Sequence, residues 1–256
     1  MPVRHKLVVF DNSGVLVDSE TLGNRLLAEM LTSEGVPTTF DEAVEHYLGR
    51  SFDAVLDTIR RRTGTALADD FGARFHARLF DVFERELTAM PGIHGVLDDL
   101  DALGVPYCVA SNDTAGRVRV ALERTGLATR LTGLVLGADQ VRRPKPAPDI
   151  FLLAAKRFGV APEGCLVVED SARGVAAARA AGMTVFGLAS LTPRARLGEA
   201  HRVLGSLTEL RALLPFLSAV LGPAPSLAAS AVSRSTPSTS PSSARGVASQ
   251  PLEARS

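Results

Sequence analysis

The sequence has few cysteines, no excess of charge and no long apolar run. Its 28 basic and 28 acidic residues balance, so no overall electric field attracts nucleic acid or an anionic membrane. No segment approaches the roughly 18 apolar residues of a membrane span, and the apolar run after Met1 is too short for a signal peptide. Cys108 and Cys165 each lie within a short apolar run, where a free thiol packs as a small apolar side chain. We therefore predict no disulfide and a cytoplasmic protein.

What the sequence does contain is a series of short aliphatic segments with helical patterns between them. The segments are residues 7–10, 106–110, 133–136, 165–168 and 184–188. Segments that are apolar on both faces are typical of a parallel sheet with helices on each side, and the patterns at 93–103, 115–125, 148–158 and 172–181 supply such helices. We predict an α/β fold with a doubly wound, Rossmann-like parallel sheet.

The interval between the first two predicted strands is too long for one crossover helix. Helical patterns cover residues 21–33, 40–47, 51–62 and 69–87, with glycines between them. We predict a core domain of residues 1–18 and 90–221, with a helical cap domain, residues 19–89, inserted into it. An insert at this point lies over the carboxyl end of the first strand, where open α/β sheets bind ligands.

From residue 222 onward the sequence consists mainly of alanine, serine, proline and threonine without apolar periodicity. Such a segment buries too little surface to offset its ordering entropy. We therefore predict a disordered tail over residues 222–256, with docking of a partner by the tail as the alternative.

Polar residues follow the predicted strands at four places. They are Asp11 in LVVFDNSGVLVDSE, Ser111 and Asn112 in CVASND, Lys145 in RRPKPAPDIF, and Glu169 and Asp170 in CLVVEDSARG. Each has a plainer interpretation, namely a turn, a helix cap, a surface lysine and a solvated capping pair. Two adjacent carboxylates at the end of a buried strand repel each other, however, and a hard cation between them and Asp11 would relieve that repulsion.

In this order, the four segments resemble the haloacid dehalogenase-like hydrolases over about residues 5–214. The wording VLVDSE and EDSARG resembles the subgroup of sugar-phosphate phosphatases and β-phosphoglucomutase. The resemblance implies that Asp11 is a nucleophile that becomes an aspartyl phosphate. It implies that Mg²⁺ is bound by Asp11, Glu169, Asp170 and the backbone carbonyl of Ser13. It also implies that Ser111, the backbone amide of Asn112 and Lys145 hold the phosphoryl oxygens.

Ser13 departs from the pattern of this family, whose phosphatases carry a second aspartate two residues after the nucleophile. A serine hydroxyl does not exchange a proton near neutral pH, and a positioned general acid/base is worth about 10²- to 10⁴-fold in rate. Three explanations stay open: a slow or altered phosphatase, an engineered inactive form of one, or a natural non-catalytic relative that binds a phosphorylated ligand. A β-phosphoglucomutase-like activity would need the missing aspartate as well.

Two other activities of the superfamily also lack that aspartate. Phosphonate cleavage uses a lysine of the cap, but no lysine lies between Lys6 and Lys145. Dehalogenation needs no metal, whereas the Glu169 and Asp170 pair favours a cation. A further departure is Asp113, which we interpret as a cap for the helix that starts near Thr114.

The cap of this family selects the substrate. Arg50, in a Gly-Arg-Ser turn, is our candidate for contacting a substrate oxygen, with a plain surface arginine as the alternative. The resemblance implies a small phosphorylated metabolite as substrate, such as a sugar phosphate or a phosphorylated sugar acid. We predict no nucleic-acid or membrane partner and a monomer or weak homo-oligomer.

The tail generates a first prediction. Truncation before Gly222 should leave the melting temperature within about a degree, because a segment that buries no surface adds little stability. Thermal melts of the full and truncated chains measure this. A fall of several degrees would show that the tail packs on the core.

Overall fold

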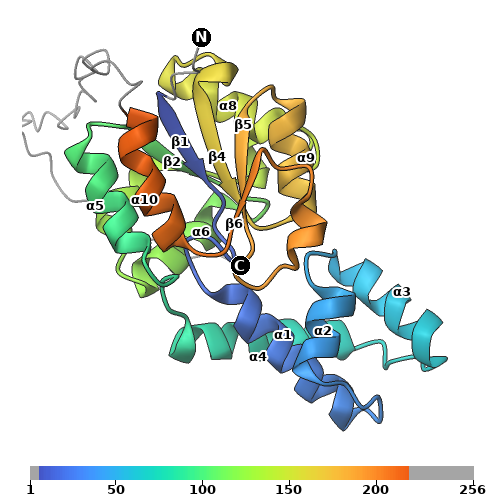
Figure 1. The fold of residues 1–256 in the computed structure, drawn as a ribbon. Coiled ribbons are helices and arrows are strands. Elements are labelled where there is room, and N and C mark those ends of the chain that lie inside the picture. The colour runs from blue at the N-terminus through green and yellow to red at the C-terminus, as the bar shows by residue number, and fades with distance from the viewer. Residues whose placement is uncertain (1–5, 219–256) are drawn as a thin grey trace, which may run out of the picture. The chain divides into compact units, whose positions relative to one another are not determined.

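The computed structural model describes residues 6–218 and has a parallel sheet at its centre (Figure 1). The six strands lie in the order β3-β2-β1-β4-β5-β6, and every neighbouring pair is parallel. They are β1 (Leu7–Phe10), β2 (Tyr107–Ala110), β3 (Val135–Leu136), β4 (Cys165–Glu169), β5 (Thr184–Leu188) and β6 (Arg202–Leu204). The chain winds outward from β1 in both directions, which confirms the predicted doubly wound α/β fold. The predicted tail lies outside the described residues.

Helices of the core cover both faces of the sheet. They are α5 (Ile93–Ala102), α6 (Ala115–Arg124), α7 (Ala128–Leu131), α8 (Asp149–Phe158), α9 (Ala172–Ala180) and α10 (Leu207–Ser218). In Figure 1, α5 and α10 lie on one side of the strands and α8 and α9 on the other. No helix in the described part combines the length and apolarity needed to cross a bilayer.

Successive residues of β1 pack into opposite halves of the core. Val8 and Phe10 belong to the apolar cluster that includes residues of α5, α6 and α10. Leu7 and Val9 belong to the cluster that includes residues of α8 and α9. Side chains alternate across a strand with a period of two, so a strand between two helical layers must be apolar at every position. This is why the segment carries no polar residue before Asp11.

Four helices form the segment between β1 and β2, as predicted. They are α1 (Ser19–Ser33), α2 (Phe40–Tyr47), α3 (Phe52–Thr63) and α4 (Phe71–Glu86), and each end lies within two residues of its predicted position. Their buried side chains, among them Leu31, Ile59 and Phe71, form an apolar cluster of their own. Thr39 and Glu42 close a capping box at the start of α2. The domain boundaries at 18/19 and 89/90 stay predictions.

The two chain segments that connect α1–α4 to the core run side by side. The amide of Asp18 donates to the carbonyl of Thr88 at 2.9 Å, and the amide of Met90 donates to the carbonyl of Leu16 at 2.9 Å. Val17 and Ala89 form an antiparallel bridge between these bonds. The cap is therefore attached through one paired crossing of the chain.

Three details at the edges of the sheet differ from the predictions. The strand predicted at 133–136 is only Val135–Leu136, because residues 132–134 form a 3₁₀ turn. The second strand begins at Tyr107, since Pro106 has no amide hydrogen to donate to the ladder. The strand β6 and the helix α10 were not predicted. β6 has three residues, of which only Leu204 is buried, so its apolar pattern is too short to recognise.

Candidate active site

The polar strand ends converge at the carboxyl edge of the sheet. Because β2, β1 and β4 are neighbours, Ser111, Asp11 and the Glu169–Asp170 pair end up side by side. All four are at most 8% exposed. Asp11 is therefore more than a surface turn residue, and the interpretation of Glu169 and Asp170 as a solvated pair is wrong.

Lys145 connects this group from the loop before α8. Only 2% of the residue is exposed, so the interpretation as a surface lysine is wrong. Its Nζ donates to Asp11 Oδ1 at 2.6 Å, to Glu169 Oε1 at 2.6 Å and to the carbonyl of Ala110 at 2.8 Å. Burial lowers the pKa of Lys145, but the carboxylates of Asp11 and Glu169 raise it above its usual value. The ammonium group is thus charged, with its three hydrogens directed at three protein oxygens.

Two residues hold the backbone of Lys145 in place. The side-chain oxygen of Asn112 accepts from the amide of Lys145 at 2.8 Å, and its side-chain nitrogen donates to the carbonyl of Lys145 at 3.1 Å. Arg173 donates to the same carbonyl at 2.7 Å. The side chain of Asn112 therefore positions the lysine loop. The sequence analysis missed Arg173, although it lies within the EDSARG segment.

Three carboxylates surround this single ammonium group. Asp11, Glu169 and Asp170 each offer an oxygen within 4.8 Å of the other two. Burial raises the pKa of Asp11 to about 7, an effect that Lys145 opposes and Glu169 reinforces. Burial and then repulsion from Glu169 and Asp11 also raise the pKa of Asp170 well above its usual range. The cluster has more negative charge than Lys145 alone can balance.

Two glycines make this crowding possible. Gly14 has a positive φ of 72°, and a Cβ there would lie 2.1 Å from Asp170 Oδ2. A Cβ at Gly174, in the first turn of α9, would lie 1.8 Å from the carboxyl carbon of Glu169. On that side, Glu169 Oε2 accepts from the amide and the hydroxyl of Ser171 at 3.0 and 2.9 Å. The carboxylates reach their positions only because these two residues lack side chains.

The segment after β2 corrects one prediction. Thr114 caps α6, because its side chain accepts from the amide of Arg117. Asp113 forms an ion pair with Arg117 at 3.3 Å instead of capping the helix. Ser111 is buried, and its Oγ accepts from the amide of Asp113 at 3.1 Å.

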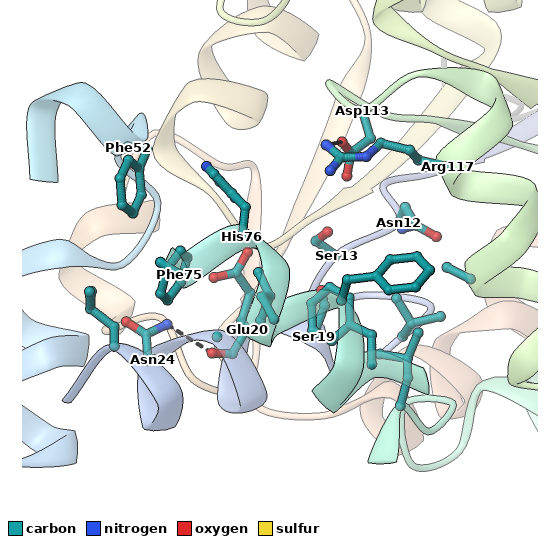
Figure 2. A pocket seen from close by; sticks show the side chains of 18 of the residues that line it. Asn12, Ser13, Ser19, Glu20, Asn24, Phe52, Phe75, His76, Asp113 and Arg117 are labelled. Atoms are coloured by element: carbon teal, nitrogen blue, oxygen red, sulfur yellow. Dashed lines mark hydrogen bonds and ion pairs between the residues drawn. The ribbon is translucent and has the colours of Figure 1, made fainter. Parts of the chain in front are cut away.

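A cavity of about 590 Å³ opens beside this cluster, lined by residues of the cap and the core (Figure 2). Ser13 and Asp113 line it from the core, and Arg50 lines it from the turn before α3. Arg50 is exposed and makes no side-chain hydrogen bond or ion pair within residues 6–218. Its guanidinium is thus free to meet a ligand, and its contact with a substrate stays a prediction.

Three further residues of the cavity wall were missed by the sequence analysis. Asn12 Oδ1 and Ser19 Oγ are buried and have no hydrogen-bond partner in the described part of the chain. Glu20 lines the cavity without an ion-pair partner there, and burial, followed by repulsion from Asp113, raises its pKa. Their signal in the sequence was weak, because an Asn, a Ser or a Glu beside a turn is ordinarily a cap or a solvated side chain.

Comparison with known proteins identifies the family of this site. The family model of the haloacid dehalogenase-like hydrolases matches residues 5–182. The chain belongs to the haloacid dehalogenase-like hydrolases. The resemblance inferred from the four polar segments is confirmed at this level.

The chain is similar to several members of this family that are named as phosphatases. It is 31% identical to hexitol phosphatase A of Escherichia coli over 81% of this chain and 94% of that protein. It is 29% identical to a bifunctional riboflavin kinase/FMN phosphatase of Arabidopsis thaliana over 80% of this chain, but spans only 54% of that longer protein. A haloacid dehalogenase-like hydrolase of Deinococcus radiodurans, solved with bound phosphate and sodium, is 34% identical, with a TM-score of 0.75 over 87% of this chain and all of that chain.

The donor set of this haloacid dehalogenase-like hydrolase fits a hard divalent cation. Carboxylate and carbonyl oxygens are the ligands that Mg²⁺ prefers. Asp11, Glu169 and Asp170 carry three potential negative charges against one ammonium group, so a dication would restore the balance. The residues present therefore fit a magnesium site.

The crowding at Gly174 generates a second prediction. Gly174→Ala should lower the free energy of unfolding by about 1–3 kcal/mol, because the new methyl group displaces Glu169 from Lys145 and Ser171. Gly116→Ala is the matched control in the first turn of α6. A Cβ at Gly116 meets nothing within 4 Å, so alanine should be neutral or stabilise by up to about 1 kcal/mol. Urea denaturation of both variants decides, and equal stability would contradict the crowding argument.

Proposed function

We propose that this chain is a magnesium-dependent phosphatase of small phosphorylated metabolites that works through an aspartyl phosphate on Asp11. One observation carries the proposal. Asp11, Lys145, Glu169 and Asp170 form a single buried cluster at the edge of the sheet, beside a cavity open to ligands. The chain's membership of the haloacid dehalogenase-like hydrolases supports it, as does its similarity to hexitol phosphatase A.

In this proposal Asp11 attacks the phosphorus atom and the substrate alcohol leaves. Lys145 holds Asp11 Oδ1 at 2.6 Å, which fixes the direction of the carboxylate. Ser111, Asn112 and Lys145 are proposed to hold the phosphoryl oxygens. For Lys145 this requires the exchange of one of its three present contacts for a phosphoryl oxygen. Arg50 is proposed to contact the leaving part of the substrate.

Asp11, the carbonyl of Ser13, Glu169 and Asp170 are proposed to hold Mg²⁺. When bound, the cation supplies charge neutralisation between Asp11 and the phosphoryl oxygens. The surplus of carboxylates over Lys145 supports this assignment, because it leaves the cluster in need of a positive charge.

Ser13 limits the proposed activity. It lines the cavity beside Asp11, where a general acid would protonate the leaving oxygen and a base would later activate water. A serine does neither near neutral pH, so we propose slow turnover. The same observation favours the second candidate function, a relative that binds a phosphorylated ligand without turning it over. It counts more strongly against a phosphomutase, which would also need the missing aspartate, than against slow hydrolysis.

The role of Asp11 generates a third prediction. Asp11→Asn should abolish Mg²⁺-dependent phosphate release across a panel of phosphomonoesters, because an amide does not act as the nucleophile. The melting temperature, measured alongside, should stay near that of the parent chain, since Lys145 keeps its ion pair with Glu169 and the cluster loses one of its surplus negative charges. Unchanged phosphate release by Asp11→Asn would contradict the assignment.

The role of Ser13 generates a fourth prediction. Ser13→Asp should raise the steady-state rate by about 10²-fold or more, the usual worth of a positioned general acid/base. Ser13→Asn is the matched control, because asparagine has nearly the same shape as aspartate but does not act as a general acid or base near neutral pH. The parent chain should instead release one equivalent of alcohol in a burst and then turn over slowly, with the phosphorylated protein accumulating to a level that mass spectrometry detects.

Two outcomes would count against this account of Ser13. If Ser13→Asn accelerates turnover as much as Ser13→Asp, the effect arises from shape and not from proton transfer. If neither variant turns over any substrate while phosphorylated ligands still bind, the non-catalytic binding function replaces the phosphatase.

A further inference from the structure

The cavity beside the carboxylate cluster has a wall of exposed apolar side chains. Within residues 6–218, five large apolar side chains are at least 39% exposed: Phe80, Leu103, Val120, Leu152 and Phe216. Two of them, Phe80 at 58% and Val120 at 43%, line this one cavity from different helices. Large apolar side chains that gather in a concave site are typical of ligand contact.

An ion pair joins the two helices that carry these side chains. Glu84 of α4 and Arg124 of α6 form a salt bridge, and Arg124 also donates to the carbonyl of Glu84 at 3.3 Å. Phe80 and Val120 each lie four residues earlier, which is one helical turn along the same face. One more turn along lie His76 and Gly116, which also line the cavity. The two helices thus both present side chains to the same space.

Gly116 leaves room within this wall. A Cβ at this position would meet nothing within 4 Å. The cavity volume of about 590 Å³ lies within the range of about 300–1,000 Å³ found for small-molecule sites. The space is sufficient for a ring system next to Phe80 and Val120.

A second part of the cavity lining is polar. Asn12 is 3% exposed and Ser19 is 9% exposed, and their side-chain oxygens Oδ1 and Oγ have no partner in the described part of the chain. Both line the cavity, and Figure 2 shows them near Ser13. Buried polar atoms are almost always hydrogen-bonded in native proteins. These two atoms are therefore suited to hydroxyl groups of a ligand, and Asn12 directly follows Asp11.

We propose that the alcohol released from the substrate is nucleoside-like, with sugar hydroxyls bound by Asn12 and Ser19 and a planar aromatic ring packed on Phe80 and Val120. The preferred substrates are then nucleoside 5′-monophosphates rather than simple sugar phosphates. This inference rests on the proposed phosphatase function. A sugar phosphate that lacks a nucleobase can bind the polar atoms of Asn12 and Ser19, but it leaves Phe80 and Val120 exposed to water.

The test uses two phosphomonoesters that differ in the presence of a nucleobase. Uridine 5′-monophosphate and ribose 5-phosphate share the phosphate and the ribose, so their ratio of kcat/KM isolates the contribution of the base. Packing of a base on an aromatic side chain is commonly worth about tenfold or more. We expect the full chain with Mg²⁺ to prefer the nucleotide by at least about tenfold.

Three variants locate the effect. Phe80→Ala should lower kcat/KM for the nucleotide by about tenfold and change that for ribose 5-phosphate less than about twofold. Phe216→Ala is the matched control, since Phe216 is 74% exposed and does not line the cavity. This variant should leave kcat/KM unchanged for both substrates. Gly116→Leu places an apolar side chain in the space beside the wall, where a Cβ meets nothing within 4 Å, and should also lower kcat/KM for the nucleotide alone.

Binding provides a readout that does not depend on turnover. Calorimetry on Asp11→Asn with Mg²⁺ should show the same preference for uridine 5′-monophosphate and the same effect of Phe80→Ala. Equal kcat/KM and equal affinity for the two compounds, or equal losses for both in Phe80→Ala, would overturn the inference. Phosphate release from other phosphomonoesters would in that case still support the proposed function. Loss of all phosphate release and all binding would overturn both.

Discussion

The buried ion cluster around Lys145 is the interaction on which the rest of the structure depends. One ammonium group with 2% of its residue exposed joins Asp11 at the end of β1 to Glu169 at the end of β4. Breaking a buried pair by removing one partner leaves an uncompensated charge and costs several kcal/mol. The loop before α8 is therefore fixed to the edge of the sheet, and Asn112 and Arg173 hold its backbone there. The cluster to which we assign the chemistry thus also sets the position of the surrounding loops.

Much of this arrangement follows from the sequence, because the fold obeys two simple periodicities. Strands between two helical layers must be apolar throughout, and this located β1, β2, β4 and β5 to within two residues. Parallel strands place their carboxyl ends together, so the polar residues after β1, β2 and β4 had to converge. The burial of Lys145 was harder to predict, because a proline-rich sequence around a lysine does not indicate whether the side chain faces water or protein. The edge strand β6 was missed because three residues carry too little pattern.

The proposed ligand of the cavity was the feature least predictable from the sequence. It depends on an apolar and a polar wall that only the folded chain brings together. Phe80 and Val120 lie 40 residues apart in the sequence, on helices of the cap and the core, and each reads as an ordinary surface residue in its own helix. The ion pair between Glu84 and Arg124 and the packing of Phe83 against the core bring the two helices together. The unpartnered oxygens of Asn12 and Ser19 are likewise invisible until burial is known. The cavity lining is thus a product of tertiary contacts, whereas the buried carboxylates are already placed by the strand ends.

The cap and the loop next to Asp11 share one structural element, the hydrogen-bonded pair of segments Leu16–Asp18 and Thr88–Met90. Gly14 donates to the carbonyl of Val17, and Val17 donates to the carbonyl of Asn12. The loop that carries Asn12 and Ser13 is thus hydrogen-bonded to the same few residues through which the cap is attached. Any rotation of the cap turns the backbone at Val17 and is transmitted to this loop over a distance of only a few bonds. A change in the angle of the cap would therefore reach the loop next to Asp11 through these hydrogen bonds, without any relay through the core.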